Sequence, residues 1–207
     1  MPSRHPWAYE RGALWVMECD APATSPVDAQ VAATYSEVGA EAAGALVTAM
    51  GISDGAVVDR LAVGSRCFVA RVADGIAAYG WVSEVVESIG ELERPFHMRK
   101  GEAYIWDCAT LPEFRRQGLY TSLLHIIATT LQREGTRRLW IGASRGNRPS
   151  LRGITSAGFQ PVIKMNYVRV FGFKHVWVSD YPGAPPLVAV EARKGLLTAS
   201  GWGHQMR

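Results

Sequence analysis

Two periods of apolar residues run along this chain, and they predict helices and strands in turn. A leucine or isoleucine at every fourth residue, at positions 119, 123, 127 and 131, is typical of a helix that buries one face. Residues 27–50 are rich in alanine and predict one kinked helix or two, because Gly39 and Gly44 interrupt them. Short apolar runs bounded by turn residues predict strands at residues 13–19, 67–72, 76–83, 103–106, 138–143, 162–171 and 175–179.

Turn and capping residues set the limits of several of these elements. Asp74-Gly75 predicts a hairpin between two strands. Gly135 is expected to end the long helix in the left-handed conformation. Asn147 is expected to cap a short helix that ends at Gly158.

Three further segments show no clear period. We expect a loose N-terminal arm at residues 1–12, a long irregular connection at 84–101, and a loose Pro- and Gly-rich C-terminal tail at 182–207. With a shorter helix at residues 53–63, the elements predict a mixed α/β fold of the α+β type, with a mainly antiparallel sheet and helices on both faces. The length of 207 residues fits one domain over residues 1–207.

The composition argues against several classes of protein. An apolar content of 48% and a charged content of 20% are ordinary for a globular domain. No apolar stretch approaches the roughly 20 residues that span a bilayer, and no signal peptide is evident, so we expect no membrane partner. The 3 cysteines lack paired spacing, which predicts no disulfide framework, no metal site and a cytoplasmic location.

The positive charge of the chain is modest but unevenly distributed. The net charge is +3, and arginines gather at positions 115, 116, 137, 138, 145, 148 and 152. They are either scattered surface charges or a basic rim for a ligand with several negative charges. Nucleic acid is not expected as a partner, because no stacking aromatic residues are interleaved with these arginines.

The segment from Asp107 to Tyr120 contains the clearest candidate chemistry. An apolar strand leads into a turn with Arg115, Arg116 and Gly118, and a helix follows. Such a junction directs free backbone N–H groups into one small space, where the helix dipole and two arginines add positive charge. The turn therefore predicts a phosphate or pyrophosphate site. The alternative is an ordinary helix start, because the pattern Arg-x-x-Gly is common.

A second patterned segment follows this turn. It contains Asn147, then Ser150, and then Gly158-Phe159 near the end of the short helix. Together with the phosphate turn, the order and separation of these residues resemble the GNAT superfamily of acyl-CoA-dependent N-acyltransferases. The resemblance covers roughly residues 65–172.

The chain departs from the family pattern at two positions. The family's phosphate-loop motif is Gln/Arg-x-x-Gly-x-Gly/Ala, and Tyr120 stands where its last small residue is usual. Many relatives carry a tyrosine after the asparagine whose phenol protonates the leaving thiolate, and Ile154 occupies that position here. Tyr120 and Tyr167 are the replacements left open.

The resemblance implies a GNAT-like fold with a sheet of about seven strands. Two parallel strands, here near residues 103–109 and 139–143, would splay apart, and the pantetheine of acetyl-CoA or another acyl-CoA would lie between them. No metal is implied. The implied binding residues are Cys108, Ala109, Thr110, Leu111, Arg115, Arg116, Gln117, Gly118, Leu119, Tyr120, Thr121, Asn147 and Ser150.

The same resemblance suggests two candidate bases on the first of these strands. Asp107 falls where the family often has an acidic residue, and Glu102 begins the same strand. The alternative for Asp107 is a turn cap or an ion pair with an arginine. Because alternate residues of a strand face opposite sides, Trp106 and Asp107 are expected on different faces unless a local bulge alters the alternation. A buried strand cysteine such as Cys108 is expected to be an apolar residue rather than a nucleophile.

The leading hypothesis is an enzyme that transfers an acetyl group from acetyl-CoA to a primary amine of a small molecule or peptide by direct attack in a ternary complex. A non-catalytic acyl-CoA-binding or sensor protein is the first alternative. A protein that binds another nucleotide, such as ATP or NAD, is the second. A homodimer through the C-terminal strands is left open.

Tyr79 and Trp81 share a strand face, where they either pack in the core or contact the acceptor.

Overall fold

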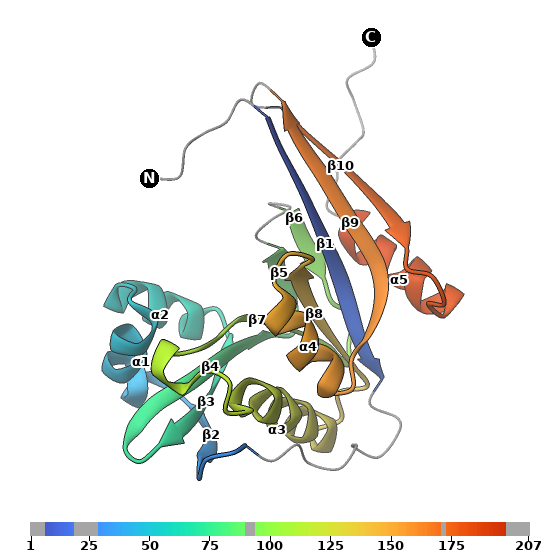
Figure 1. Cartoon of the computed structure of the whole chain (residues 1–207). Helices are drawn as coiled ribbons and strands as arrows, with labels where there is room; N and C mark the ends of the chain where they lie inside the picture. The colour runs from blue at the N-terminus through green and yellow to red at the C-terminus, as the bar shows by residue number, and fades with distance from the viewer. Residues whose placement is uncertain (1–6, 19–28, 90–93, 171–172, 198–207) are drawn as a thin grey trace.

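An eight-stranded sheet forms the centre of the molecule, with the strand order β10-β9-β1-β8-β7-β4-β3-β2 (Figure 1). The computed structural model describes residues 7–18, 29–89, 94–170 and 173–197. The strands are β1 (Trp7–Glu18), β2 (Thr34–Val38), β3 (Arg66–Val72), β4 (Gly75–Ser83), β5 (Val86–Ile89), β6 (Arg94–His97), β7 (Glu102–Thr110), β8 (Arg138–Ser144), β9 (Gln160–Val170) and β10 (Phe173–Asp180). The helices are α1 (Ala43–Met50), α2 (Asp54–Ala62), α3 (Leu119–Arg133), α4 (Arg148–Ser156) and α5 (Pro186–Leu197), with short 3-10 turns η1 (Ala40–Ala42) and η2 (Pro112–Phe114).

One pair of neighbouring strands in this sheet is parallel. The pair is β7 and β8, whereas the other neighbours in the sheet run antiparallel. Parallel strands need a long crossover, and α3 supplies it between β7 and β8. The loops at both ends of α3 therefore lie at the two ends of the parallel pair.

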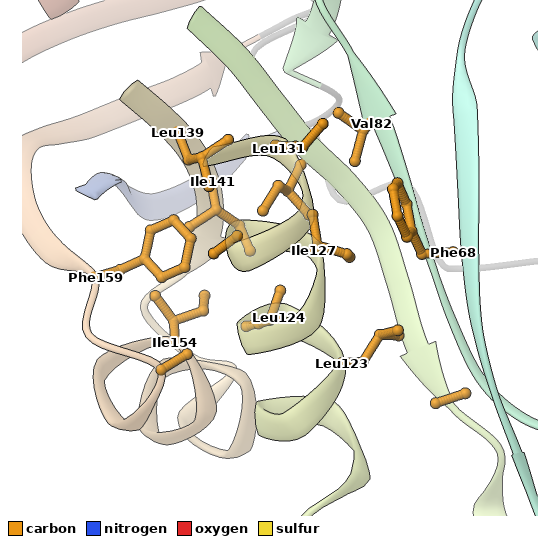
Figure 2. Close-up of a cluster of buried hydrophobic side chains, with 14 of the residues drawn as sticks. Phe68, Val82, Leu123, Leu124, Ile127, Leu131, Leu139, Ile141, Ile154 and Phe159 are labelled. Carbon is orange, nitrogen blue, oxygen red and sulfur yellow. The ribbon is translucent and has the colours of Figure 1, made fainter. Parts of the chain in front are cut away.

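The alternation of side chains along β3 decides which helices cover which face. Phe68 and Ala70 belong to the core cluster under α3 and α4, and Cys67 and Val69 belong to the cluster under α1 and α2. Figure 2 shows the first cluster, in which the apolar face of α3 meets side chains from β3, β4 and β8. The expected helix with an apolar residue at every fourth position is confirmed, and its inward residues include Leu119, Leu123, Ile127 and Leu131.

A third cluster joins the C-terminal helix to the sheet. Ala189 and Ala192 of α5 are buried against Phe96 of β6 and Trp140 of β8. The expectation of a loose tail from residue 182 is therefore wrong for residues 186–197. These residues form a helix with a buried apolar side, which the Pro- and Gly-rich composition of the segment did not indicate. The expected irregular connection at 84–101 likewise contains the β5–β6 hairpin.

The N-terminal part of the chain differs most from expectation. Residues 7–12 belong to β1 rather than to an irregular arm, because they pair with β9. Residues 34–38 form β2 at the edge of the sheet rather than part of a helix. Pairing of Tyr35 with Ala70 of β3 outweighs the helix propensity of the surrounding alanines. Residues 1–6, 19–28 and 198–207 of the expected arm, first helix and tail lie outside the described residues.

The predicted fold class is confirmed, with eight strands in the main sheet rather than about seven. Helices cover both faces, since α3 and α4 pack on one side and α1 and α2 on the other. None of the helices in the described part of the chain combines the length and the apolar character that a membrane crossing requires.

Candidate functional site

The two parallel strands separate halfway along their length. β7 and β8 pair from Glu102 and Arg138 as far as Ile105 and Ile141. Beyond that point β7 continues beside β4 to Thr110, and β8 continues beside β1. The facing edges of the two strands, both fully described, make no further ladder with each other, so β7 has no partner strand on this edge after Ile105. Apart from Trp106 O and Thr110 O, which accept from Cys108 Sγ and Arg115 Nε, its backbone groups there can meet a ligand. The expected splay is confirmed.

A β-bulge lies at the point where the strands separate. Tyr79 pairs with Ala109 and Trp81 with Trp106, so that two residues of β7, Asp107 and Cys108, lie opposite Gly80 alone. Asp107 has a φ of 41°, in the left-handed region. Because of the bulge, Asp107 and Trp106 both contact the same arginine of α2. The simple alternation of these two residues is therefore broken by a local bulge, the exception that we allowed for.

The bulge turns the thiol of Cys108 to the other side of the sheet, toward α3. A Cβ atom added to Gly80 would lie 2.8 Å from Cys108 Sγ and 3.3 Å from the end of Ile127, so glycine is needed opposite the bulge. Burial raises the pKa of the Cys108 thiol well above its ordinary value. A thiol that stays protonated is a poor nucleophile. This agrees with the expectation that Cys108 is an apolar residue.

The turn after β7 leaves a group of backbone amides without acceptors. Gly118 precedes α3 with a φ of 79°, and the first helical bond runs from Ser122 N to Gly118 O at 3.0 Å. In the part of the chain that the structure describes, the N–H groups of residues 118–121 have no hydrogen-bond acceptor. These amides and the helix dipole form the arrangement that binds anions.

The side chains of the turn either brace it or remain exposed at its rim. Arg115 Nε donates to Thr110 O at 3.3 Å, and Gln117 Nε2 donates to Glu113 O at 3.3 Å. Arg115 and Arg116 are exposed and precede the free amides by two or three residues along the chain. Arg145, Arg148 and Arg152 are also exposed, on and before α4.

Two of the clustered arginines lie elsewhere in the molecule. Arg137 Nη2 donates to Lys100 O at 3.1 Å, and Arg138 forms ion pairs at the start of β8. This is the end of the parallel pair where the strands are still joined. The basic rim that we considered from the sequence therefore does not include Arg137 or Arg138.

Tyr120, which replaces the small residue of the loop motif, fits between α3 and α4. A Cβ atom on Gly153 of α4 would lie 2.4 Å from Tyr120 Cδ1, so the ring occupies space that this glycine leaves open. The Tyr120 hydroxyl and the Ser150 hydroxyl are 3.0 Å apart. Burial raises the pKa of the Tyr120 phenol, which keeps it protonated at neutral pH.

The second patterned segment forms the expected helix start. Asn147 caps α4 by accepting a hydrogen bond from Ser150 N at 3.2 Å, and its side chain is exposed. Ile154, at the position of the family's tyrosine, is fully buried in the core under α3. The side chain of Tyr167, the other replacement considered, lies outside the described part of the structure.

The strand residues expected to bind through their backbone are not equally available. Leu111 N donates to Ala77 O at 2.9 Å, and its own carbonyl accepts from Phe114 N at 3.0 Å. These bonds argue against the expected backbone contact at Leu111. Thr110 Oγ1, by contrast, is a buried oxygen with no hydrogen-bond partner among the described residues. A buried oxygen without a partner, on the part of β7 beyond the separation point, suits a polar ligand.

The two candidate bases lie at opposite ends of β7 in different surroundings. Glu102 accepts hydrogen bonds from Arg138 Nη1 at 3.0 Å, Trp140 Nε1 at 3.2 Å and Arg99 N at 3.1 Å. Its side chain is only 9% exposed, and it lies where β7 and β8 are still paired. A carboxylate fixed by three donors away from the splayed edges is poorly suited to accept a proton from a substrate.

Asp107 lies at the separation point and contacts one charged partner. Its Oδ2 accepts from Arg60 Nη1 at 2.6 Å, and its side chain is 37% exposed. The ion pair that we considered as an alternative for Asp107 is thus present. Arg60 was missed in the sequence, although Val57 and Leu61 mark the inward face of its helix and Arg60 lies between them. The helical period offered this signal.

The sequence and structure comparisons agree with this geometry. The family model described as Acetyltransferase (GNAT) family matches residues 52–159, which is more than half of the chain. The chain therefore belongs to the GNAT acetyltransferase family. No curated protein matches it significantly.

Solved structures of the same family share the fold at low sequence identity. A GCN5-related N-acetyltransferase from Sphaerobacter thermophilus aligns with a TM-score of 0.56 and 13% identity, over 84% of this chain and 53% of that one. A GNAT-family acetyltransferase from Colwellia psychrerythraea aligns with a TM-score of 0.53 and 12% identity, over 78% of this chain and 56% of that one. The present chain thus spans little more than half the length of these two proteins.

A shorter relative covers less of the chain. The ribosomal-protein-S18-alanine N-acetyltransferase from Escherichia coli aligns with a TM-score of 0.50 and 18% identity, over 62% of this chain and 78% of that one. At such identities the likeness concerns the fold, and the acceptor of this chain has to be argued from its own residues.

Proposed function

We propose that this protein is an N-acetyltransferase that transfers an acetyl group from acetyl-CoA to a primary amine. The observation that carries the proposal is the continuity of two binding surfaces. The edge of β7 that has no partner strand after Ile105 is followed, after the turn of residues 111–117, by the free amides of residues 118–121. A long ligand with a polar arm and a pyrophosphate, such as a coenzyme A thioester, matches this pair of surfaces.

The proposed contacts divide between the two surfaces. The pantetheine arm lies along Cys108, Ala109 and Thr110, where the Thr110 hydroxyl lacks a partner. The pyrophosphate is bound by the amides of Gly118 to Thr121, with Arg115 and Arg116 beside them. From the second segment, the exposed side chain of Asn147 and the hydroxyl of Ser150 contribute polar contacts.

The reaction proceeds by direct attack within a ternary complex. The acceptor arrives as an ammonium ion and loses one proton to Asp107, directly or through water. Its nitrogen lone pair then forms a C–N bond with the thioester carbon as the C–S bond breaks. The nitrogen then gives up its second proton, the departing thiolate takes up a proton to form the CoA thiol, and the proton held by Asp107 passes to solvent, so one proton is released for each acetyl group transferred. Positioning alone can lower the barrier by about 7–11 kcal/mol.

No strong acid is required for the departing thiolate. Thiol pKa values lie near 8.5, so the thiolate is a tolerable leaving group at neutral pH. Ile154 is buried and cannot donate a proton, whereas the Tyr120 phenol is protonated and hydrogen bonded to Ser150. Glu102 is not included in the mechanism because Arg138, Trp140 and Arg99 already occupy its carboxylate.

Calorimetric titration with acetyl-CoA, with ATP and NAD as controls, tests the cofactor. We expect micromolar binding of acetyl-CoA alone. Release of free CoA with a panel of primary amines then separates an enzyme from a sensor, because a sensor binds acetyl-CoA without turnover. Binding of ATP or NAD in place of acetyl-CoA would overturn the proposal.

A further inference from the structure

Arg60 of α2 contacts Asp107 and two indole rings, those of Trp106 and Trp81. Its Nη1 donates to Asp107 Oδ2 at 2.6 Å. Its guanidinium carbon lies 4.6 Å from the ring centroid of Trp106 and 5.1 Å from that of Trp81. A cation held over two indole rings and against a carboxylate defines a cation site, and a side chain of the protein itself fills it.

The indole rings are fixed by contacts other than those to Arg60. Trp81 is fully buried, and its ring lies 5.9 Å from that of Trp106. Trp106 Nε1 donates to Ser83 Oγ at 2.9 Å, and Ser83 Oγ donates to Glu87 Oε2 at 2.8 Å. Because a hydroxyl has a single proton, the 3.2 Å contact between Ser65 and Ser83 is then donated by Ser65. The two indole rings would therefore keep their positions if Arg60 moved.

Arg60 itself is held by interactions that a competing cation can replace. Its side chain is 24% exposed and that of Asp107 is 37% exposed. Partly exposed ion pairs and cation–π contacts each contribute little to stability, because water competes for both groups. Arg60 lies near the end of a nine-residue helix, and only its side chain has to rotate to vacate the site.

We propose that Arg60 occupies, in the free protein, the place of the acceptor's ammonium group. This inference rests on the proposed function, because the site includes Asp107, the proposed base, at the point where β7 and β8 separate. It assigns the acceptor to one chemical class: an aliphatic primary amine at the end of an unbranched methylene chain, which arrives positively charged. Three methylene groups and a terminal cation make the arginine side chain a close mimic of such an arm.

The same chemistry disfavours other amines. An arylamine is neutral at neutral pH, so it lacks the charge–charge attraction to Asp107 and the cation–π attraction to the indole faces. Arg60 cannot itself become the acceptor, because its guanidinium does not deprotonate in proteins. It therefore acts as a positioning and competing group rather than as a catalytic residue.

Titration of the full chain with pentylammonium chloride, followed through the ¹⁵N–¹H resonances of the tryptophan indoles, tests the inference without turnover. The Trp106 resonance is assigned with Trp106→Phe, and potassium chloride at equal concentration controls for ionic strength. In Arg60→Met, which removes the charge and keeps an apolar stem, we expect the Kd for pentylammonium to fall by about 5- to 30-fold. Arg60→Lys should remain near the wild-type value, and Arg60→Gln provides a second neutral variant.

Two further measurements make the result specific. Adding Asp107→Asn to Arg60→Met should remove the gain, and 1-pentanol, which lacks the charge, should bind no better to Arg60→Met than to wild type. An unchanged or higher Kd for pentylammonium in both neutral variants would overturn the inference.

Failure of this inference can be told apart from failure of the proposed function. If acetyl-CoA does not bind in the calorimetric titration, the acetyltransferase proposal fails, while the pentylammonium Kd still reports on the cation site. If acetyl-CoA binds and amines are acetylated, but Arg60→Met leaves the KM for 1,5-diaminopentane unchanged, only the assignment of the acceptor class fails.

Discussion

The two ends of β7 carry one carboxylate each, and they differ in almost every other respect. At the first end, β7 pairs with β8 from Glu102 and also with β4 from Tyr104, and Glu102 accepts hydrogen bonds from Arg138, Trp140 and the Arg99 amide. At the other end β8 has left, and Asp107 lies on a bulge with a single arginine beside it.

The difference shows how one strand serves two purposes. At the first end, Glu102 of β7 forms an ion pair with Arg138 of β8, and Arg138 also forms an ion pair with Glu191, which holds α5 to the sheet. Where one edge is free, the same kind of backbone has unused hydrogen-bonding capacity, which is costly unless a ligand or water meets it. We therefore place the chemistry at the second end and the structural ion pairs at the first.

The largest expected effect concerns the loop beyond the free end. Gly118→Asp would place a carboxylate among the amides of residues 118–121 and should weaken acetyl-CoA binding by about 100-fold or more through like-charge repulsion. Gly118→Asn is the matched control, since asparagine adopts the φ of 79° at a similar cost without the charge. Calorimetry compares the two. Equal losses of affinity would mean that backbone strain, rather than charge, is responsible.

A comparably sharp test removes the carboxylate at the bulge. Asp107→Asn should lower kcat by about 10²- to 10⁴-fold, the usual contribution of a positioned base, and leave acetyl-CoA binding unchanged. Asparagine tolerates the φ of 41° at this position, so the fold should survive. Initial rates of CoA release across a pH series provide the measurement. Full turnover at every pH would eliminate Asp107 as the base.

At the end of β7 that is paired with β8, we expect a substitution to reduce stability rather than activity. Glu102→Gln should lower the free energy of unfolding by about 2–4 kcal/mol, because it removes a largely buried charge from Arg138 while leaving kcat almost unchanged. Glu113→Gln is a control on the exposed surface. Urea unfolding and CoA release would be measured on the same samples. A large loss of kcat in a stably folded Glu102→Gln variant would reverse our assignment of the two carboxylates.

The smallest expected effect concerns how stability depends on pH at the end of β7 that is paired with β8. The hydrogen bond from Arg138 lowers the pKa of Glu191 below its ordinary value of 4.5. A lowered carboxyl pKa adds stability above 4.5, and this stability disappears as the pH falls through the folded-state pKa. Since Glu191 is partly exposed, the contribution should be under about 1 kcal/mol. Urea unfolding would be measured at neutral pH and at a pH below the ordinary carboxyl pKa. Between these two pH values, the free energy of unfolding should fall less in Glu191→Gln than in wild type.

Features that depend on neighbouring residues were predictable from the sequence. The left-handed Gly135, the helix end at Gly158 and the cap at Asn147 all lie where the sequence indicated. Each feature involves hydrogen bonds within a few residues along the chain, so the amino-acid types alone nearly decide it. The same holds for the apolar period of α3 and for the turn that leads into it.

Features that depend on distant residues were not predictable in this way. Arg60 and Asp107 are separated by 47 positions, and their contact requires α2 to pack beside the bulge. The helix expected around residues 34–38 became a strand because β3 supplied a partner. The space for Tyr120 depends on Gly153 in another helix.

The sequence by itself determined the local framework of this protein: the β7–turn–α3 junction, the cap of α4 and the apolar faces that cover the sheet. These follow from backbone conformations and short-range hydrogen bonds that each residue type favours. Only the tertiary structure decided that β7 and β8 separate after Ile105, that the bulge opposite Gly80 turns Asp107 toward α2, and that Arg60 forms an ion pair with Asp107 there. Those outcomes arise from the pairing and packing of segments far apart in the chain. Local sequence patterns do not predict the free energies of these long-range contacts.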